Sequence, residues 1–267
     1  MAASSSAAGS SSLGPPDGDN DGVVDAADNC PGAANPGQEN EDGDMFGNAC
    51  DRCPALSSTT QPDLDQDGVG DACDPSAARH TFAFFDGFDG PLDATAWRGE
   101  GNPWTAAGGQ LQQSQTSNDG AAPLLVAVGL NPGTSFEVEL RFAYTMVDPT
   151  VMPDTHNVGV TLGLNGGNTG WYVGVIHRAG HPSQLNIYVL TNNTADQPAA
   201  GSLLPGELQV GTPYTLRVQV QPDNITATVG SANVSHMLNT PLDGEVGLRT
   251  RRAAVAVDYL QVIQLAP

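Results

Sequence analysis

Apolar and polar residues alternate along much of the chain after residue 80, and Gly, Pro and Asn interrupt the pattern at short intervals. Residues 136–142 read FEVELRF, and residues 214–221 read YTLRVQVQ. A period of two is typical of strands with one buried face. We expect further strands near residues 82–88, 122–129, 157–164, 171–177, 184–190, 225–229, 245–249 and 254–263. So many strands in about 185 residues predict an all-β sandwich or barrel.

The chain before residue 79 lacks this pattern. Residues 1–16 are rich in Ser, Ala and Gly, which is the composition of a flexible linker, and they have neither the basic nor the apolar region of a secretory signal. Residues 17–78 are acidic and contain few apolar side chains. We therefore expect a linker at 1–16, an acidic segment at 17–78 and a β-domain at 79–267.

The charge of the chain is concentrated in the acidic segment. The whole chain has 30 Asp and Glu against 9 Lys and Arg, a net charge of -21, and residues 1–78 hold 15 of the acids with Arg52 as their only base. Such a charge disfavours nucleic acids and anionic membranes as partners and favours cations. No apolar run approaches the ~20 residues of a transmembrane helix, so membrane insertion is not expected.

Three twelve-residue stretches, 17–28, 40–51 and 63–74, repeat with a period of 23 and place oxygen-bearing side chains at positions 1, 3, 5, 9 and 12. Calcium takes six to eight oxygen ligands, which alternate residues of a tight loop can supply, whereas magnesium prefers a rigid octahedron. A solvated acidic linker gives no reason for the fixed register. We therefore predict at least three Ca²⁺ ions. The expected side-chain ligands are Asp17, Asp19, Asp21, Asp25, Asp28, Asn40, Asp42, Asp44, Asn48, Asp51, Asp63, Asp65, Asp67, Asp71 and Asp74, with the position 7 carbonyls of Val23, Phe46 and Val69.

The loops differ at position 6, where the chain must turn sharply. Gly22 and Gly68 meet this need, but the middle loop has Met45 there and amides at two ligand positions. We expect the middle loop to be the weakest or the most strained of the three. The spacers 29–39 and 52–62 contain prolines and no helical period, so these loops are not EF-hands.

All four cysteines lie in the acidic segment and follow its period. Of the three pairings that four cysteines allow, Cys30–Cys50 with Cys53–Cys73 is favoured because each disulfide then closes the same kind of loop. A zinc site and free thiols are the alternatives, although hard carboxylates dominate the surroundings. Since no ordinary core can form here, metal ions and cross-links must hold the segment.

Four motifs of the acidic segment are those of a known family: DNCP at 28–31, NPGQ at 35–38, GNACD at 47–51 and DQDGVGDACD at 65–74. With these motifs, residues ~17–75 resemble thrombospondin type 3 repeats. The resemblance implies calcium wrapped in an irregular disulfide-linked chain, the same consecutive cysteine pairing and more than one ion in a repeat. Arg52 departs from the pattern, where the family has Asn before the cysteine, and so does the Ser58-Thr59 pair in place of Asn-Pro.

Three longer sequence motifs in the β-domain indicate a second resemblance: FFDGFDGPLDATAW at 84–97, WTAAGGQL at 104–111 and GEVGLRTRRAAVAVDYLQVIQ at 244–264. Residues ~80–267 resemble a concanavalin A-like or laminin-G-like jelly roll. This implies adjacent first and last strands, and a structural calcium that would use Asp258 with Asp86. An Asp on an outer strand face explains Asp258 equally well.

The β-domain shows no catalytic motif. Glu137 and Glu139 do not complete the E-x-D-x-x-E pattern of laminarinase-type hydrolases, so we interpret them as a solvated strand face. No G-x-S-x-G elbow is present. We expect Trp97 and Trp104 in the core. Trp171 with Tyr172, after a Gly/Asn-rich turn, is the candidate for exposed sugar-stacking residues. His177 and His181 are expected in a surface turn rather than at a metal site.

Together these features predict an extracellular calcium-binding adhesion or surface protein, in which a calcium-stiffened spacer presents a sandwich that binds a glycan or a cell-surface protein. Disulfides and calcium loops of about 10⁻⁴–10⁻³ M affinity both fit the outside of the cell. The alternative is a carbohydrate-active enzyme, or its accessory carbohydrate-binding domain. A structural spacer and cap without a ligand is a third hypothesis.

Overall fold

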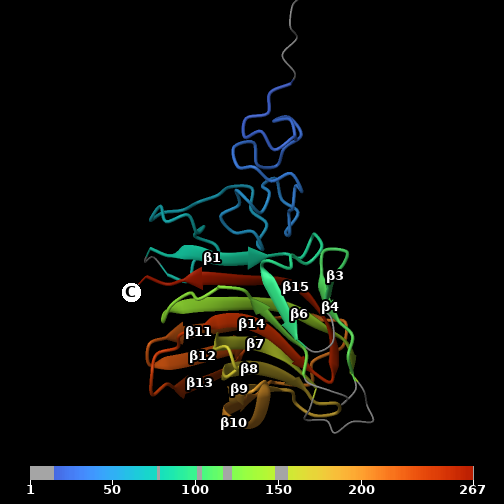
Figure 1. Ribbon diagram of the computed structural model, residues 1–267, viewed down its shortest axis with the longest axis vertical. Helices are drawn as coiled ribbons and strands as arrows, with labels where there is room; N and C mark the ends of the chain where they lie inside the picture. The colour runs from blue at the N-terminus through green and yellow to red at the C-terminus, as the bar shows by residue number, and fades with distance from the viewer. Residues whose placement is uncertain (1–14, 77–78, 101–103, 117–121, 148–155, 267) are drawn as a thin grey trace, which may run out of the picture.

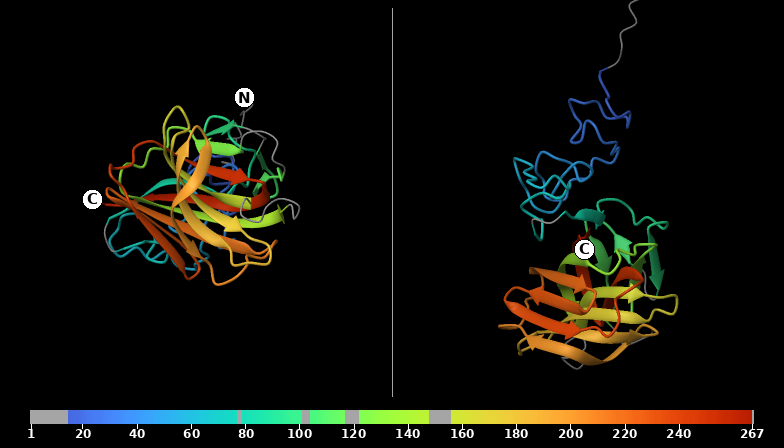
Figure 2. Two further views of the ribbon diagram at one scale, coloured as in Figure 1. Left: turned by 90° about the horizontal axis from the view of Figure 1, so that it is seen from below. Right: turned by 90° about the vertical axis from the view of Figure 1, so that its left-hand side faces the viewer.

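The protein is described by a computed structural model for residues 15–76, 79–100, 104–116, 122–147 and 156–266. From residue 81 onward it is an all-β sandwich of two antiparallel sheets, which curl over one another as a jelly roll (Figures 1 and 2). The sequence-based fold class is therefore confirmed. None of the described segments forms a helix with the length and hydropathy that spanning a bilayer requires.

The two sheets divide the described strands between them. Sheet A runs in the order β13 (Ala232–Met237), β12 (Asn224–Val229), β11 (Pro213–Gln221), β6 (Phe136–Val147), β15 (Ala253–Gln264), β4 (Leu111–Gln113) and β3 (Thr105–Ala106), with β1 (Thr81–Asp86) also paired to β15. Sheet B runs in the order β10 (Thr194–Leu203), β9 (Gln184–Thr191), β8 (Gly170–His177), β7 (His156–Leu164), β14 (Glu245–Arg251), β5 (Leu124–Ala127) and β2 (Trp97–Glu100).

The core lies between the facing sides of the two sheets. In β6 the apolar residues of the alternation, from Phe136 to Tyr144, are at most 1 % exposed, and the polar residues between them point to the other side. Strands β11 and β12 contribute Leu216, Val218 and Ile225 in the same way. Trp97 and Trp104 are buried in this core, as the sequence predicted. The alternation of apolar and polar residues therefore determines which side chains are buried between the sheets and which point to the other side.

The first and last strands lie side by side, which is the arrangement that the jelly-roll resemblance implied. β1 pairs with the C-terminal half of β15, from Leu260 to Gln264, while β4 pairs with its N-terminal half, from Val255 to Val257. The opposite edge of β15 pairs with β6 along its length. β15 therefore holds the centre of sheet A.

Five described strands were not predicted: β2, β3, β4, β10 and β13. β2, β3 and β4 have two to four residues, too few to show a period. β10 contains Pro198 and Gly201 and is an edge strand with two register shifts against β9. An edge strand tolerates proline because one side of it needs no ladder hydrogen bonds. Tertiary pairing, and not local preference, makes these segments extended.

Residues 15–76 form neither helix nor strand, and they pack on the outer side of sheet A over β1 and β15 (Figures 1 and 2). Two disulfides cross-link them, Cys30–Cys50 and Cys53–Cys73, each closing a separation of 20 residues. This is the consecutive pairing of the three that the sequence allows, so neither free thiols nor a zinc–thiolate site is formed.

The position of the repeats corrects the prediction for β6. Glu137 and Glu139 face the repeats rather than open solvent, and the Glu139 side chain is only 14 % exposed. A cavity of about 270 Å³ remains between the two parts. Its walls are Ala55, Leu56, Ala72, Cys73, Asp74 and Pro75 of the repeats and Glu137, Glu139, Arg141, Thr215, Arg217, Tyr259 and Gln261 of sheet A. An antiparallel sheet can leave one face to water, but here a second part of the chain covers it.

The β6 packing can be tested with Leu140, which is completely buried between the sheets. We expect Leu140→Ala to lower the free energy of unfolding by about 2–5 kcal/mol, because it removes buried methyl groups and leaves a cavity. Leu203→Ala is the matched control, since Leu203 is 58 % exposed, and it should change stability by less than about 0.5 kcal/mol. Chemical denaturation measures both. Equal losses for the two variants would contradict the placement of the core.

Candidate metal centre in the acidic repeats

The first and third acidic loops share one backbone course. Gly22 and Gly68, at position 6, both have φ of +97°, and Asn20 and Gln66, at position 4, are left-handed as well. Glycine is favoured at such angles because it lacks a Cβ atom. Two left-handed residues within three, at positions 4 and 6, wind the chain tightly enough to turn positions 1, 3 and 5 toward one centre.

The middle loop turns by other means, which corrects part of its prediction. Its left-handed residue is Gly43 at position 4, with φ of +71°, and Met45 at position 6 is not among the residues with positive φ. The backbone strain expected at Met45 is therefore absent, and its side chain is 67 % exposed. Asn40, at position 1, donates its amide N–H to the carbonyl of Asp44 at 2.9 Å.

The carboxylates of each loop converge. Ligand atoms within 4.8 Å of one another are offered by positions 1, 3 and 5 of the first and third loops, and by positions 3, 5 and 12 of the middle loop. These three groups are Asp17, Asp19 and Asp21; Asp63, Asp65 and Asp67; and Asp42, Asp44 and Asp51. A fourth group joins Asp67 and Asp74 to His80, which lies next to β1.

Several carboxylates in these loops use one oxygen and leave the other without a partner. Asp19 and Asp42 accept the amide N–H two residues on at 3.2 and 3.0 Å, and Asp28 and Asp51, at position 12, do the same at 2.8 and 2.7 Å. The buried oxygens without a hydrogen bond are Asp17 Oδ1, Asp19 Oδ2, Asp28 Oδ2, Asp42 Oδ2, Asp51 Oδ2 and Asp65 Oδ2. Buried polar atoms are rarely left unpaired, and hard oxygens in this number fit Ca²⁺.

Electrostatics show the same deficit of positive charge. Burial, together with repulsion from neighbouring carboxylates, raises the pKa of Asp19, Asp42, Asp51 and Asp65. Backbone N–H groups oppose this effect only in part. A divalent cation among these groups would favour their ionised forms, because it supplies the missing opposite charge.

Position 9 makes a contact within its loop that the sequence did not predict. Asp25, Asn48 and Asp71 each accept the backbone N–H of position 2 in their own loop, at 2.7, 2.9 and 2.8 Å. Asp25 and Asp71 are not members of the converging carboxylate groups of the described residues. Their shared role is to close the loop, and an amide serves as well as a carboxylate for that. Position 7 also makes the same contact in all three loops. The backbone N–H groups of Val23, Phe46 and Val69 each donate to the position 5 carboxylate of their own loop at 2.7 Å.

Position 5 links each loop to the next part of the chain. Asp21 accepts the N–H of Asn35 at 2.8 Å, and Asp44 accepts that of Ser58 at 2.9 Å, in both cases 14 residues on. Asp67 accepts the N–H of His80 in the same manner. His80 is buried, and its Nδ1 lies 2.7 Å from Asp74 Oδ1. The sequence analysis missed His80, because its separation of 13 residues from Asp67 differs from the 14 residues of the first two loops and the repeat period does not mark it.

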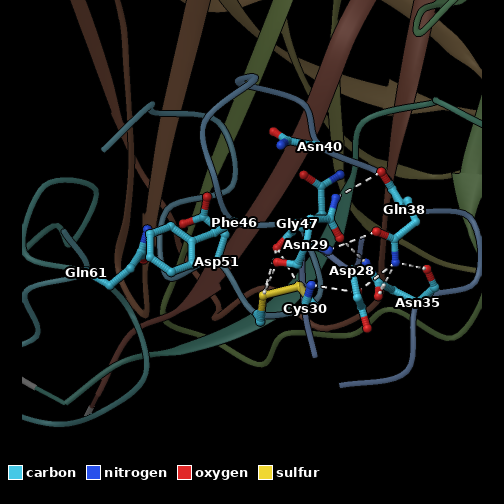
Figure 3. The surroundings of a disulfide bond; sticks show 12 residues. Asp28, Asn29, Cys30, Asn35, Gln38, Asn40, Phe46, Gly47, Asp51 and Gln61 are labelled. Carbon is cyan, nitrogen blue, oxygen red and sulfur yellow. Dashed lines mark hydrogen bonds between the residues drawn. A yellow bond between two sulfur atoms is a disulfide. The ribbon is translucent and has the colours of Figure 1, made fainter. Parts of the chain in front are cut away.

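The Cys30–Cys50 disulfide is surrounded by polar contacts (Figure 3). Beside Cys30–Cys50, Asn29 donates from its side chain to the carbonyl of Gln38 at 3.1 Å, and Gln38 donates to Asp28 Oδ1 at 2.8 Å. The disulfide thus fixes the chain that carries the position 12 carboxylate. This local order compensates for the lack of buried apolar surface.

Asp86 and Asp258, for which the jelly-roll resemblance implied a shared calcium, each accept hydrogen bonds from nearby side chains. Asp86 accepts the indole N–H of Trp97 at 2.7 Å. Asp258 accepts the Arg141 Nε–H at 2.9 Å and the side-chain amide of Gln110 at 2.8 Å. Each carboxylate is bound by side-chain donors of its own surroundings, and neither belongs to a converging group of the described residues.

Trp171 and Tyr172 do not form an exposed platform. Tyr172 is fully buried on the outer side of sheet B, where it donates to Asn157 Oδ1 at 2.9 Å and the guanidinium of Arg249 lies 4.9 Å from its ring. Trp171 points to the opposite side, packs against the core and lies 4.9 Å from His236. Adjacent residues of a strand face opposite sides, so one ligand cannot stack on both.

The predicted histidine turn is correct only in part. His181 lies in an exposed turn, but His177 is the last residue of β8 and is 3 % exposed. Its ring contacts Tyr144 and His156 inside the sandwich. Burial lowers the pKa of His177, and the nearby Glu207 opposes that effect.

Comparison with protein families identifies residues 16–38 as a thrombospondin type 3 repeat. Comparison with curated protein sequences gave no match. These residues contain the whole first loop and its spacer. The match therefore supports calcium as the cation for the first converging group.

Solved structures with a similar strand arrangement come from several kinds of protein. The carbohydrate recognition domain of Emp47p has a TM-score of 0.49 and 15% identity, over 70% of this chain and 97% of that one. SCLam, a non-specific endo-beta-1,3(4)-glucanase from family GH16, has 0.48 and 14%, over 70% and 92%. A mutant of the GH43 protein BlXynB from Bacillus licheniformis has 0.45 and 12%, over 67% of this chain but only 39% of that one. We take no function from similarities of this size.

The converging groups can be tested against the loop-closing position in the first loop. We expect Asp19→Asn to weaken calcium binding by one ion at least about tenfold, because ligand charge sets the affinity of such loops. Asp25→Asn is the matched control and should have a much smaller effect, since Asn48 already fills position 9 of the middle loop. Isothermal titration with Ca²⁺ measures both. Equal effects would show that the two positions have one role.

The raised carboxyl pKa values also predict a pH dependence of the calcium-free protein. In the native calcium-free protein, the carboxyl groups of Asp19, Asp42, Asp51 and Asp65 bind protons more tightly than in the unfolded chain, whose Asp pKa is near 3.8, while the lowered pKa of Asp63 acts in the opposite direction. This contribution to stability is therefore present below about pH 3.8 and is lost as the pH rises toward neutrality. We expect thermal unfolding in calcium-free buffer to occur at a lower temperature at pH 7 than at pH 4.5, and calcium to remove the difference. A higher unfolding temperature at pH 7 than at pH 4.5 in calcium-free buffer would contradict this prediction.

Proposed function

We propose that residues 17–75 are a calcium-binding array of thrombospondin type 3 repeats, with at least three ions. The carrying observation is the set of buried carboxylate oxygens without hydrogen bonds that face shared centres in all three loops. The family match covers only the first repeat. The same contacts at positions 5 and 9 in the second and third loops support its extension to the rest.

Calcium would take the place of a hydrophobic core in this array. Loops with three to five carboxylates repel themselves, and the segment has little apolar surface to bury. Ions at the three centres would cancel that repulsion and fix positions 1, 3, 5 and 12. The position 5 carboxylates then tie each loop to the next, and Asp67 ties the last one to His80 and the sandwich. The array at 17–78 and the sandwich at 79–267 are thus proposed as two parts joined by calcium.

The proposal includes an extracellular location, which two properties of the repeats support. Both disulfides persist under oxidising conditions, and loops of this kind fill at the calcium concentrations found outside cells. In that setting the array would serve as a stiff spacer on a surface or adhesion protein.

For the sandwich we propose binding of a glycan or a protein rather than catalysis. The carboxylate of Glu139 accepts hydrogen bonds from Arg217 and Tyr259, and the repeats cover this face of sheet A. Strands β9, β10 and β13 lie at the end of the sandwich opposite the repeats (Figure 1). Exposed apolar side chains on these strands support a binding role there. They are Val189, Leu203 and Met237. Glycan-array binding that Met237→Ser weakens would support this face, and an array without any binding would count against a glycan.

The enzyme hypothesis keeps one specific observation in its favour. Burial raises the pKa of Glu137, next to Glu139 at the cavity between the two parts. A carboxyl group of this kind could act as a general acid toward a sugar. Turnover of a β-glucan by the full chain, lost in Glu137→Gln but kept in the control Glu245→Gln, would favour the enzyme. No turnover on a polysaccharide panel would favour binding alone.

Chelation tests the calcium function directly. In EDTA we expect residues 17–78 to become sensitive to proteases at neutral pH, because ionised carboxylates then repel each other without compensation. The sandwich should stay resistant, since its core contains no predicted ligand. Limited proteolysis with mass spectrometry measures this, and excess Ca²⁺, but not an equal concentration of Mg²⁺, should restore resistance. Unchanged cleavage of the repeats in EDTA would exclude the proposed function.

A further inference from the structure

The first and third loops can be compared directly, because they share their ligand residues and their backbone conformation. Both have aspartate at positions 1, 3, 5, 9 and 12, and both turn at a glycine with φ of +97°. Both gather positions 1, 3 and 5 within 4.8 Å. On ligand type and backbone course alone, the two loops would bind Ca²⁺ with similar affinity. A difference between them must come from neighbouring groups.

Arg52 is such a neighbour of the third loop. Its Nε lies 3.5 Å from Oδ2 of Asp63, the position 1 carboxylate. Its backbone N–H donates to the side chain of Gln61 at 2.8 Å, and its Nη1 donates to the carbonyl of the same residue at 2.8 Å. These contacts hold the guanidinium beside one member of the converging group.

The repeat shows what Arg52 has replaced. Asn29 stands 23 residues earlier, and it makes the same two contacts with Gln38, at 2.9 and 3.1 Å. An asparagine is therefore sufficient for the fold of this position. Arginine keeps the hydrogen bonds and adds a positive charge, which reaches the neighbouring loop. Arg52 is also the only cationic residue of the acidic segment.

We propose that Arg52 competes with calcium in the third loop, so that this loop binds Ca²⁺ more weakly than the first and fills after it. The inference rests on the proposed calcium function and concerns the same sites. The guanidinium pairs with an oxygen of Asp63 that the ion would share, and it repels the ion once bound. The total ligand charge of such a loop sets its affinity, and Arg52 cancels one of five negative charges.

Weaker calcium binding in the third loop matters because this loop lies next to the sandwich. Its position 5 carboxylate, Asp67, binds the N–H of His80, directly before β1. The weaker site is therefore the one at the joint between the array and the sandwich. As calcium rises, the outer loop would order first and the joint afterwards. Arg52 thus sets the calcium concentration at which the sandwich is fixed to the spacer.

The test is isothermal titration of the full calcium-free chain with Ca²⁺ at low, constant salt. The wild type should show at least one weaker site. R52Q, which is shorter and keeps an amide N–H donor but removes the charge, should tighten that site about threefold to tenfold. R52K, which keeps the charge, should stay within about twofold of the wild type. Because Arg52 is 45 % exposed, added NaCl should reduce the difference between R52Q and the wild type.

A second variant assigns the effect to the third loop. D65A removes both side-chain oxygens of Asp65 and should abolish calcium binding in that loop, so R52Q in a D65A background should bind calcium like D65A alone. Identical titrations for R52Q and the wild type, in a chain that does bind calcium, would overturn the inference and leave the proposed function intact. A gain that persists in the D65A background would overturn it as well. A wild-type chain that binds no Ca²⁺ would overturn the proposed function, and the inference with it.

Discussion

Repulsion between closely spaced carboxylates is the constraint on which the architecture of the repeats depends. The loops bring aspartate oxygens within 4.8 Å of one another and bury several of them without a hydrogen bond. Backbone N–H groups and two disulfides position these side chains but do not neutralise them. An added cation balances such an arrangement at neutral pH, and every feature of the segment is consistent with that need.

The same constraint connects the repeats to the sandwich. The position 5 carboxylate of each loop bonds to the chain 13 or 14 residues on, and in the third loop that chain is the entry to β1. The repeats then lie on charged residues of β6, β11 and β15, where Glu139 is paired with Arg217 and Tyr259. A polar sheet face can be covered without large cost when its charges are paired in this way.

Much of the fold and the location of the acidic clusters followed from periodicity. The period of two placed Phe136, Leu140 and Leu216 in the core, and the period of 23 located the loops, their clustered positions and the cysteine pairs. Short and edge strands such as β3 and β10 could not be predicted, because their conformation comes from pairing with distant strands. The roles of Asp25 and His80 were likewise hidden, since they depend on backbone donors that only the folded loop brings near.

Sequence alone determined the all-β class of the sandwich and the positions of the acidic loops, because both rest on local repeats of side-chain chemistry. Only the tertiary structure decided which faces are covered and which groups meet. It buried Tyr172 under Arg249, gave Asp86 and Asp258 separate partners, and set the charge of Arg52 beside the third loop. Contacts between residues far apart in the chain, or across a turn, depend on three-dimensional distance, which periodicity does not encode.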